Sequence, residues 1–298
     1  PRLKTTLFIL FQQIVPQHLL SRLVGLLANC TQPWLKNWLI KRFIAHFNVN
    51  MSEAKNPEPE AYVNFNAFFT RELKEGARKI TVDEHLLISP ADGAISEIGN
   101  IEHGRILQAK GRGYSLTALV GGDEKRAEPF IGGRFATIYL SPKDYHRVHM
   151  PAGAVLKESI YIPGDLYSVN QTTAENVDSL FARNERLVSI FETEHGPMAM
   201  ILVGAMIVAG IETLWSGQVA PPPKSARKIF STDADTALIL EQGAEMGRFK
   251  LGSTVILLFP DQAVEWIDSL RAGTPVRLGE VIGEFTQLSD SSDNSKEA

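Results

Sequence analysis

Apolar positions near the start of the chain are spaced as in short amphipathic helices. Pro16 and the Thr31-Gln32-Pro33 segment interrupt this pattern and divide it into three parts. Helices are therefore predicted over residues 3–15, 17–28 and 34–47. A polar, proline-containing stretch follows, and another short helix is predicted over residues 65–73.

From residue 86 onward, short apolar runs alternate with turn signals such as Asp92-Gly93 and Pro163-Gly164. Strands are predicted over residues 94–98, 106–109, 135–140, 155–162, 187–192, 198–208 and 255–259. The pattern predicts an α+β fold, in which N-terminal amphipathic helices are followed by a mostly antiparallel, β-rich domain. The expected divisions are a helical region at 1–75, the β-rich domain at 76–286 and a polar, disordered tail at 287–298.

The net charge of −4 conceals an asymmetry between the start of the chain and the rest. Residues 1–50, called the leader below, contain six Lys or Arg and no Asp or Glu, which leaves −10 for the remaining residues. The cations are interleaved with Leu, Ile, Phe and Trp. This pattern favours an anionic membrane surface over nucleic acid as the partner.

The third predicted helix carries an amphipathic pattern. Its apolar residues at helical spacing are Trp34, Leu35, Trp38, Leu39, Phe43 and Phe47, with Lys36, Lys41 and Arg42 nearby. Both a membrane-surface helix and an ordinary helix packed on the body fit this pattern.

Two common sequence classes are excluded. No stretch reaches the ~18 apolar residues of a membrane-spanning helix, and no small-residue cleavage site follows the first apolar run. The single cysteine, Cys30, provides neither an intrachain disulfide nor a cysteine-based zinc site. We therefore expect a protein that stays in the cytoplasm.

The segment Leu251-Gly252-Ser253-Thr254 places a Gly-Ser bond between a basic run, which includes Arg248 and Lys250, and an apolar strand. Such a bond is a candidate site of self-cleavage, in which Ser253 becomes a reactive carbonyl group. The Gly-Ser-Thr tripeptide alone is expected by chance in roughly one chain in ten of this length. The interpretation therefore depends on other residues.

His146 and His149 lie three residues apart in the segment 144–150, after a predicted strand. In an extended segment this spacing points two side chains to opposite faces, so each histidine could transfer protons in a separate step. A pair of structural histidines is the alternative. A metal site is also an alternative, but the sequence offers no convincing partner ligands.

Asp92 lies in the Ser89-Pro90-Ala91-Asp92-Gly93 turn, before a predicted strand. An aspartate that orients a histidine, which in turn deprotonates a serine, is the general arrangement of an activated nucleophile. Ordinary turn chemistry is the alternative. The sequence lacks the Gly-x-Ser-x-Gly elbow of α/β-hydrolases, and Leu116 stands where a dinucleotide loop starting at Gly111 needs its third glycine.

Taken together, these motifs resemble the bacterial, membrane-associated phosphatidylserine decarboxylase proenzymes. The resemblance covers nearly the whole chain up to about Phe285, and the acidic tail is the least similar part. The other matching stretches are Gln108-Ala109-Lys110-Gly111, Pro163-Gly164-Asp165-Leu166 and Phe181-Ala182-Arg183-Asn184-Glu185-Arg186.

The resemblance implies how the chain is cut. His149, oriented by Asp92 with Asp144 as a supporting group, removes the hydroxyl proton of Ser253, and the serine oxygen attacks the carbonyl of Gly252. Glycine suits that position because no side chain obstructs the attack. The ester then breaks by β-elimination, and the resulting dehydroalanine tautomerises and hydrolyses with loss of ammonia, which makes Ser253 a covalent pyruvoyl group. The two resulting chains, β and α, stay associated.

The implied activity is that of a carbon-carbon lyase that uses the pyruvoyl group in place of pyridoxal phosphate or a metal. Through a Schiff base with the substrate amine, the group accepts the electrons left behind when CO₂ departs. Phosphatidylserine is the implied substrate and phosphatidylethanolamine the product. His146 is the implied acid that protonates the substrate Cα.

The resemblance also gives the leader a role, since basic helices can hold an active site at an anionic membrane. The implied location is peripheral, on the cytoplasmic face of the inner membrane, with 1–75 membrane-associating and 76–286 catalytic. No nucleic-acid partner is expected, and a homodimer is left open. The alternatives are a membrane-bound serine esterase using Ser253, His149 and Asp92, and a non-catalytic lipid-binding protein.

Overall fold

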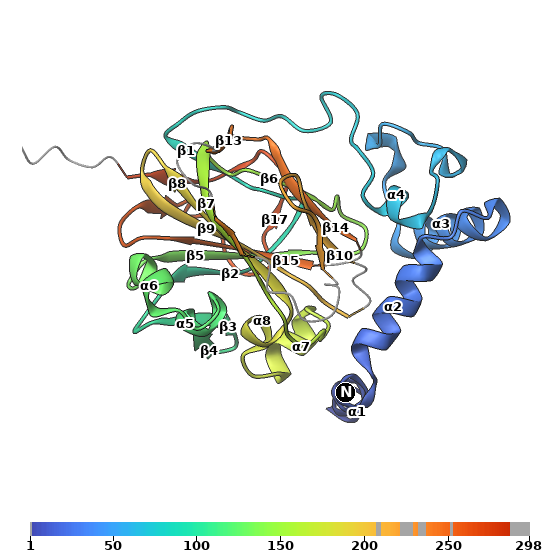
Figure 1. Ribbon diagram of the computed structural model, residues 1–298, viewed down its shortest axis with the longest axis horizontal. Helices are drawn as coiled ribbons and strands as arrows, with labels where there is room; N and C mark the ends of the chain where they lie inside the picture. The colour runs from blue at the N-terminus through green and yellow to red at the C-terminus, as the bar shows by residue number, and fades with distance from the viewer. Residues whose placement is uncertain (1, 207–209, 221–228, 232–236, 251–252, 287–298) are drawn as a thin grey trace, which may run out of the picture.

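The computed structural model describes residues 2–206, 210–220, 229–231, 237–250 and 253–286. Figure 1 shows three leader helices to one side of a β-rich body. The helices are α1 (Arg2–Ile14), α2 (Gln17–Ala28) and α3 (Pro33–Phe47), which confirms the predicted leader. Two 3₁₀ turns, η1 (Met51–Glu53) and η2 (Pro59–Ala61), lead to α4 (Phe65–Phe69).

The fourth predicted helix is wrong beyond Phe69, since α4 ends there and Thr70 caps it. The backbone that follows pairs with an earlier segment instead of continuing the helix. Lys55 N donates to Glu72 O at 2.8 Å, and Lys74 N donates to Glu53 O at 2.9 Å. These hydrogen bonds join residues far apart in sequence, so local periodicity could not predict the end of the helix.

The body is built on one nine-stranded sheet with the order β12-β7-β8-β9-β15-β5-β2-β17, in which β13 also pairs with β7. Every described pair of strands is antiparallel, which confirms the predicted α+β class. The strands are β2 (Gly93–Asn100), β5 (Arg134–Leu140), β7 (Ala154–Ile162), β8 (Arg186–Thr193), β9 (Gly196–Val203), β12 (Ile229–Ser231), β13 (Leu238–Leu240), β15 (Ser253–Phe259) and β17 (Pro275–Val276).

Three smaller sheets complete the body. They have the orders β11-β10-β14-β6, β1-β18-β16 and β3-β4. Their strands are β1 (Leu86–Ile88), β3 (Arg105–Ala109), β4 (Arg112–Ser115), β6 (Arg147–His149), β10 (Gly210–Thr213), β11 (Gly217–Ala220), β14 (Glu245–Lys250), β16 (Val264–Trp266) and β18 (Val281–Phe285). Short helices connect them: α5 (Leu116–Leu119), α6 (Glu124–Ala127), η3 (Glu128–Phe130), α7 (Gln171–Asn176) and α8 (Leu180–Arg183).

The centre of the large sheet is buried on both faces. Residues 254–258 of β15 are all fully buried, and their side chains alternate between the two main hydrophobic clusters of the body. This explains why the sequence reads there as a continuous apolar run rather than as an alternating one.

The predicted strands are present, but the strand predicted over 198–208 is wrong beyond Val203, where β9 ends. The Gly204 N–H still donates to Glu185 O, next to β8, at 2.8 Å, but its carbonyl accepts from the side chain of Asn184, through Nδ2 at 2.9 Å. Residues 207–208 of this prediction and the predicted disordered tail at 287–298 lie outside the described residues.

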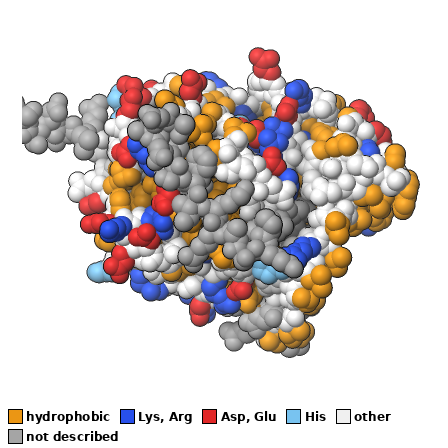
Figure 2. All heavy atoms as spheres, in the orientation of Figure 1, with side chains coloured by type: hydrophobic (Ala, Val, Ile, Leu, Met, Phe, Trp, Pro, Cys, Tyr) orange, Lys and Arg blue, Asp and Glu red, His pale blue; other side chains and the backbone are white. Residues whose placement is uncertain are grey.

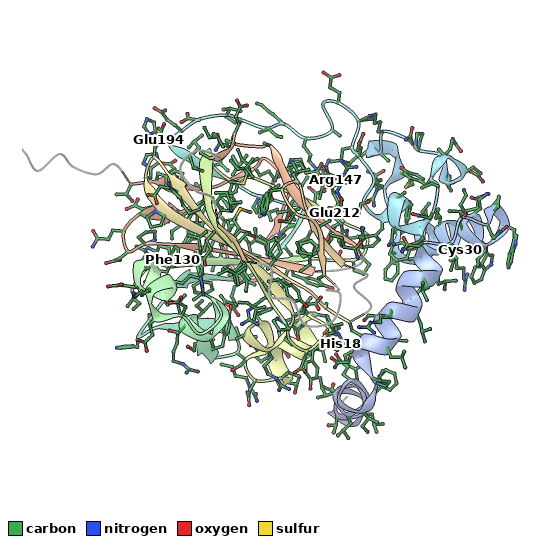
Figure 3. All side chains as sticks on the ribbon, viewed as in Figure 1. His18, Cys30, Phe130, Arg147, Glu194 and Glu212 are labelled. Atoms are coloured by element: carbon green, nitrogen blue, oxygen red, sulfur yellow. The ribbon has the colours of Figure 1, made fainter. Side chains whose placement is uncertain are left out.

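Polar side chains fasten the leader to the body. The buried side chain of Gln12 accepts a hydrogen bond from Ser168 N at 2.8 Å, and Gln17 Oε1 accepts one from Leu166 N at 2.7 Å. His18, labelled in Figure 3, lies 3.1 Å from Gly164 O through Nε2. Gln12 and Gln17 therefore hold α1 and α2 against the loop before α7.

Candidate active site

The segment before the proposed cleavage site and the segment after it are both fixed to the same stretch of chain, residues 140–149. Ser253, the first residue of β15, pairs with Leu140, the last residue of β5. On the other side of the site, Phe249 N of β14 donates to His146 O at 3.0 Å, and β14 pairs with β6. Leu251, Gly252 and the side chain of Ser253 lie outside what the structure describes.

His146 is fully buried, and its ring lies against Phe69 with centroids 4.0 Å apart. Its Nδ1 donates to Asp144 O at 2.9 Å. The other nitrogen, Nε2, therefore carries no proton in the neutral ring, and among the described residues it has no hydrogen-bond partner. Burial lowers the pKa of His146 to about 3, so the ring is neutral at physiological pH.

Arg71 is a buried neighbour of His146 that the sequence analysis did not identify. Its Nη2 donates to Lys143 O at 3.2 Å and to Asp144 O at 3.4 Å, so it holds the carbonyl that also fixes His146. The guanidinium lies over the ring of Phe68 at 5.6 Å. An arginine directly after the apolar helix α4 was the only sequence signal for this contact.

His149 has a partner at each ring nitrogen. Nδ1 donates to Gly243 O at 2.8 Å, and Nε2 lies 3.1 Å from the hydroxyl of Tyr145. Burial raises the pKa of Tyr145 and lowers the pKa of His149, so the tyrosine hydroxyl donates to a neutral imidazole. Nε2 of His149 is therefore unprotonated, and its lone pair accepts a hydrogen bond from the Tyr145 hydroxyl.

Asp92 lies next to the strand of His149, because His149 N donates to Pro90 O at 2.8 Å. Its carboxylate, however, is held by Arg78, which donates from Nε at 2.9 Å to Oδ1 and from Nη2 to Oδ2. Leu278 N also donates to Oδ1 at 2.9 Å. In the part of the chain that the structure describes, the Asp92 carboxylate thus bonds to these groups and not to the His149 ring.

Asp144 uses its carboxylate to close its own turn. Oδ2 accepts hydrogen bonds from the backbone N and from Oγ of Ser141, both at 2.7 Å. The backbone carbonyl of the same residue accepts from His146 Nδ1. Asp144 therefore positions the carbonyl that orients His146, and its described hydrogen bonds do not reach His149.

The basic run before the proposed cleavage site is neutralised by acidic residues of the β11-β10-β14-β6 sheet. Lys250 lies 3.0 Å from Glu212, and Arg248 lies 3.1 Å from Glu245. Arg147 pairs with Glu245 at 2.8 Å, and Figure 3 shows Arg147 and Glu212 within this sheet. These ion pairs connect β14, β10 and β6 on the side of the site where β14 ends.

Comparison with known proteins identifies the family. The family model described as phosphatidylserine decarboxylase matches residues 65–284, and one described as PSD matches residues 7–48. The phosphatidylserine decarboxylase proenzyme of Stutzerimonas stutzeri strain A1501 is 57% identical over 283 residues, 95% of each chain. The proenzyme of Pseudomonas putida strain GB-1 is 56% identical over 286 residues, covering 96% of this chain and all of the relative. This chain therefore belongs to the phosphatidylserine decarboxylase family.

Proposed function

We propose that this chain cuts itself between Gly252 and Ser253, and that Ser253 becomes the pyruvoyl group with which it decarboxylates phosphatidylserine to phosphatidylethanolamine and CO₂. Its relatives carry the name of phosphatidylserine decarboxylase proenzymes, which supports both parts of the proposal. The observation that carries it is the fixing of both flanking strands to residues 140–149, since this brings the histidine-bearing segment to the bond.

In the cleavage step, His149 acts as the base for the Ser253 hydroxyl. Its neutral ring is oriented through Nδ1 by Gly243 O, and Nε2 is free to accept a proton once the Tyr145 hydroxyl moves away. The serine oxygen bonds to the carbonyl carbon of Gly252 as the peptide C–N bond breaks, and the leaving nitrogen of Ser253 takes the proton from His149. β-Elimination of the ester and hydrolysis of the dehydroalanine, with loss of ammonia, then leave the pyruvoyl group. Asp92 supports this step by fixing Arg78 and the turn beside His149.

The product chains stay associated because β15 lies between β9 and β5 in the large sheet. Residues 254–258 of this strand are fully buried, so the shorter chain is held by main-chain hydrogen bonds and by apolar contacts on both faces. The new N-terminus at Ser253 therefore remains beside Leu140.

The pyruvoyl group supplies a carbonyl that condenses with an amine and accepts the electron pair left by departing CO₂. A buried site in which Nε2 of His146 has no partner among the described residues fits this chemistry. At rest, Nε2 of His146 carries no proton. An arriving substrate carboxylate would raise the pKa of His146, so that Nε2 can take up a proton and deliver it to the substrate Cα.

The leader is proposed to hold the enzyme at the anionic membrane that contains its substrate, peripherally on the cytoplasmic face. Trp34 and Trp38 of α3 are 73% and 59% exposed, as membrane-surface residues would be. Ile40 on the same helix is fully buried in a cluster with Phe65 and Phe68 of α4, so α3 also packs against α4. Within the described residues, no helix has the length and apolarity needed to cross a bilayer.

The intact mass of the purified protein under denaturing conditions tests the proposal. We expect two chains, residues 1–252 and 253–298, with a borohydride-reducible carbonyl on the second. Ser253→Ala should give one chain without decarboxylase activity, whereas the control Ser216→Ala should be cut normally. A single unmodified chain from active protein would overturn the proposal. Reaction of that intact chain with a serine-directed phosphonate would point to the esterase instead.

A further inference from the structure

A groove of about 350 Å³ lies between α2 and α3, away from the reacting residues. Its apolar walls include Val24 and Leu27 of α2, Trp38, Leu39 and Phe43 of α3, and Phe65 of α4. The polar side chains that line it are Arg42 and His46, four residues apart on one face of α3. An apolar groove of this size with a few polar groups is typical of small-ligand sites.

The groove continues into an exposed apolar surface of the leader. Leu23 and Leu26 of α2 are 56% and 71% exposed, and Trp34 and Trp38 of α3 are also largely exposed. Figure 2 shows hydrophobic side chains gathered over the leader helices. A contiguous exposed apolar surface of this kind marks a site of interaction with a protein or a membrane.

The charges around the groove favour a ligand with an anionic group. Two cations of α3 are engaged by the 3₁₀ turn η2, since Lys41 lies 2.5 Å from Glu60 and Lys36 Nζ donates to Glu60 O at 3.2 Å. Arg42 has no ion pair among the described residues, and the leader carries no acidic residue. A cation at the end of an apolar groove complements an amphiphile with an anionic head group.

An aromatic layer separates the groove from the catalytic residues. Phe43, which lines the groove, lies 5.8 Å from Phe69, and the other side of Phe69 contacts His146 at 4.0 Å. A chain lying in the groove therefore stays outside the reacting site. This position argues against the substrate molecule itself as the occupant.

We propose that the groove between α2 and α3 binds one acyl chain of a membrane phospholipid other than the reacting substrate, with its phosphate at Arg42 and His46. The occupant is a neighbouring anionic lipid of the same bilayer. The inference extends the proposed function, because it assigns the leader a discrete lipid site in addition to a general attraction to the membrane. It does not depend on cleavage at Ser253.

The test uses 1-myristoyl-lysophosphatidylglycerol below its critical micelle concentration, titrated into the full-length protein by calorimetry. Val24→Trp fills the groove, whereas Leu26→Trp adds the same ring to an exposed position of α2 outside the groove. We expect Val24→Trp to weaken binding at least tenfold and Leu26→Trp to change it less than twofold. Equal affinities in the two variants would overturn the proposal.

The charge requirement is tested by a second pair of variants. Arg42→Gln should weaken binding of the same lysolipid about fivefold, and Arg22→Gln, which removes an equal charge from α2, less than twofold. Monomyristoylglycerol, which has the chain but no phosphate, should bind the wild type about as weakly as the lysolipid binds Arg42→Gln. Equal losses from the two arginine variants would contradict a phosphate site at Arg42.

Two further outcomes would assign the groove to another occupant and overturn the proposal. One is displacement of the lysolipid by soluble dihexanoyl phosphatidylserine, which would make the groove part of the substrate site. The other is a wild-type dimer that does not bind lysolipid and that Val24→Trp dissociates in sedimentation. Circular dichroism checks that each variant is folded, and a denaturing gel records self-cleavage. A wild type that binds lysolipid but is not cut would contradict the proposed function and leave the lipid site intact.

Discussion

The imidazole of His146 lies against the ring of Phe69, with the two ring centroids 4.0 Å apart. Phe69 ends α4 and belongs to an aromatic cluster that also contains Phe43 of α3. The helical part of the chain therefore forms one wall around the residue proposed to protonate the substrate. Phe69 helps to exclude water from His146, which keeps that ring neutral.

The buried His146 makes stability depend on pH. Below about pH 6.5 the unfolded histidine binds a proton, whereas the native one does not do so until about pH 3. Stability should therefore fall as the pH drops through this window, with a limiting slope of about 1.4 kcal/mol per pH unit from this residue. Urea unfolding of the uncut Ser253→Ala protein between pH 7 and 5 measures the slope.

In that background, His146→Asn should remove this contribution to the slope. His103→Asn is the matched control, because His103 is exposed and its φ of 51° suits asparagine. A His146→Asn protein with the full wild-type slope would contradict the assignment.

Tyr145→Phe should shift the pH dependence of self-cleavage. The tyrosine hydroxyl donates to Nε2 of His149 and so favours the neutral ring. Its removal raises the pKa of His149, and since the neutral ring is the base, the acid limb of the cleavage rate should move to higher pH. Cleavage of newly synthesised protein, followed on gels from pH 5 to 8, measures this shift. Tyr167→Phe, which loses a hydroxyl elsewhere, should leave the limb in place.

Arg78→Gln and Asp92→Asn should each slow self-cleavage at least tenfold, if the Asp92 carboxylate acts by fixing Arg78. Both side chains are nearly buried, at 7% and 10% exposed, so breaking the pair should also cost about 3–5 kcal/mol of stability. The double variant should cleave no more slowly than the slower single variant. Gel assays and urea unfolding measure the two effects.

Arg277→Gln is the matched control for Arg78→Gln, since Arg277 also contacts Glu53 but its side chain is 60% exposed. It should change stability by less than about 1 kcal/mol. If Arg78→Gln cleaved at the wild-type rate while Asp92→Asn did not, Asp92 would act on His149 directly.

Gly164→Ala should destabilise the protein by about 1–3 kcal/mol, because the added Cβ would lie 2.2 Å from Arg183 O and 2.7 Å from Asn184 C. Gly153→Ala should be close to neutral, since its nearest neighbour would be Gln242 N at 3.9 Å. Urea unfolding compares the two variants. Equal stabilities would show that the loop around Gly164 moves freely enough to accept the methyl group.

The sequence could predict the features that short stretches encode. The leader helices follow from local spacing, and the strands of the large sheet follow from apolar runs between turns. The ends of α4 and β9 were missed because the residues that follow them hydrogen-bond to distant parts of the chain, Glu72 to Lys55 and the Gly204 carbonyl to the Asn184 side chain. The three-residue strand β6 could be assigned only from its pairing with β14 in the structure.

In the candidate site, too, the sequence predicted the residues but not the contacts between them. Ser253, His149, Asp92 and His146 were found through motifs, and the structure gathers their segments around residues 140–149. The contacts that set their chemistry were not predictable. Arg78 meets Asp92 across 14 positions with no periodic relation, and Arg71 reaches Asp144 across 73.

The hydrogen bonds that Gln12 and Gln17 accept from the backbone N–H groups of Ser168 and Leu166 make the leader a fixed part of the body. A leader joined by a slack linker would let the body tumble above the bilayer. If the leader binds the bilayer as proposed, α1 and α2 docked in this way would set one orientation of the β sheet relative to the membrane normal. The active site would then approach the lipid head groups from one constant direction and at one constant height.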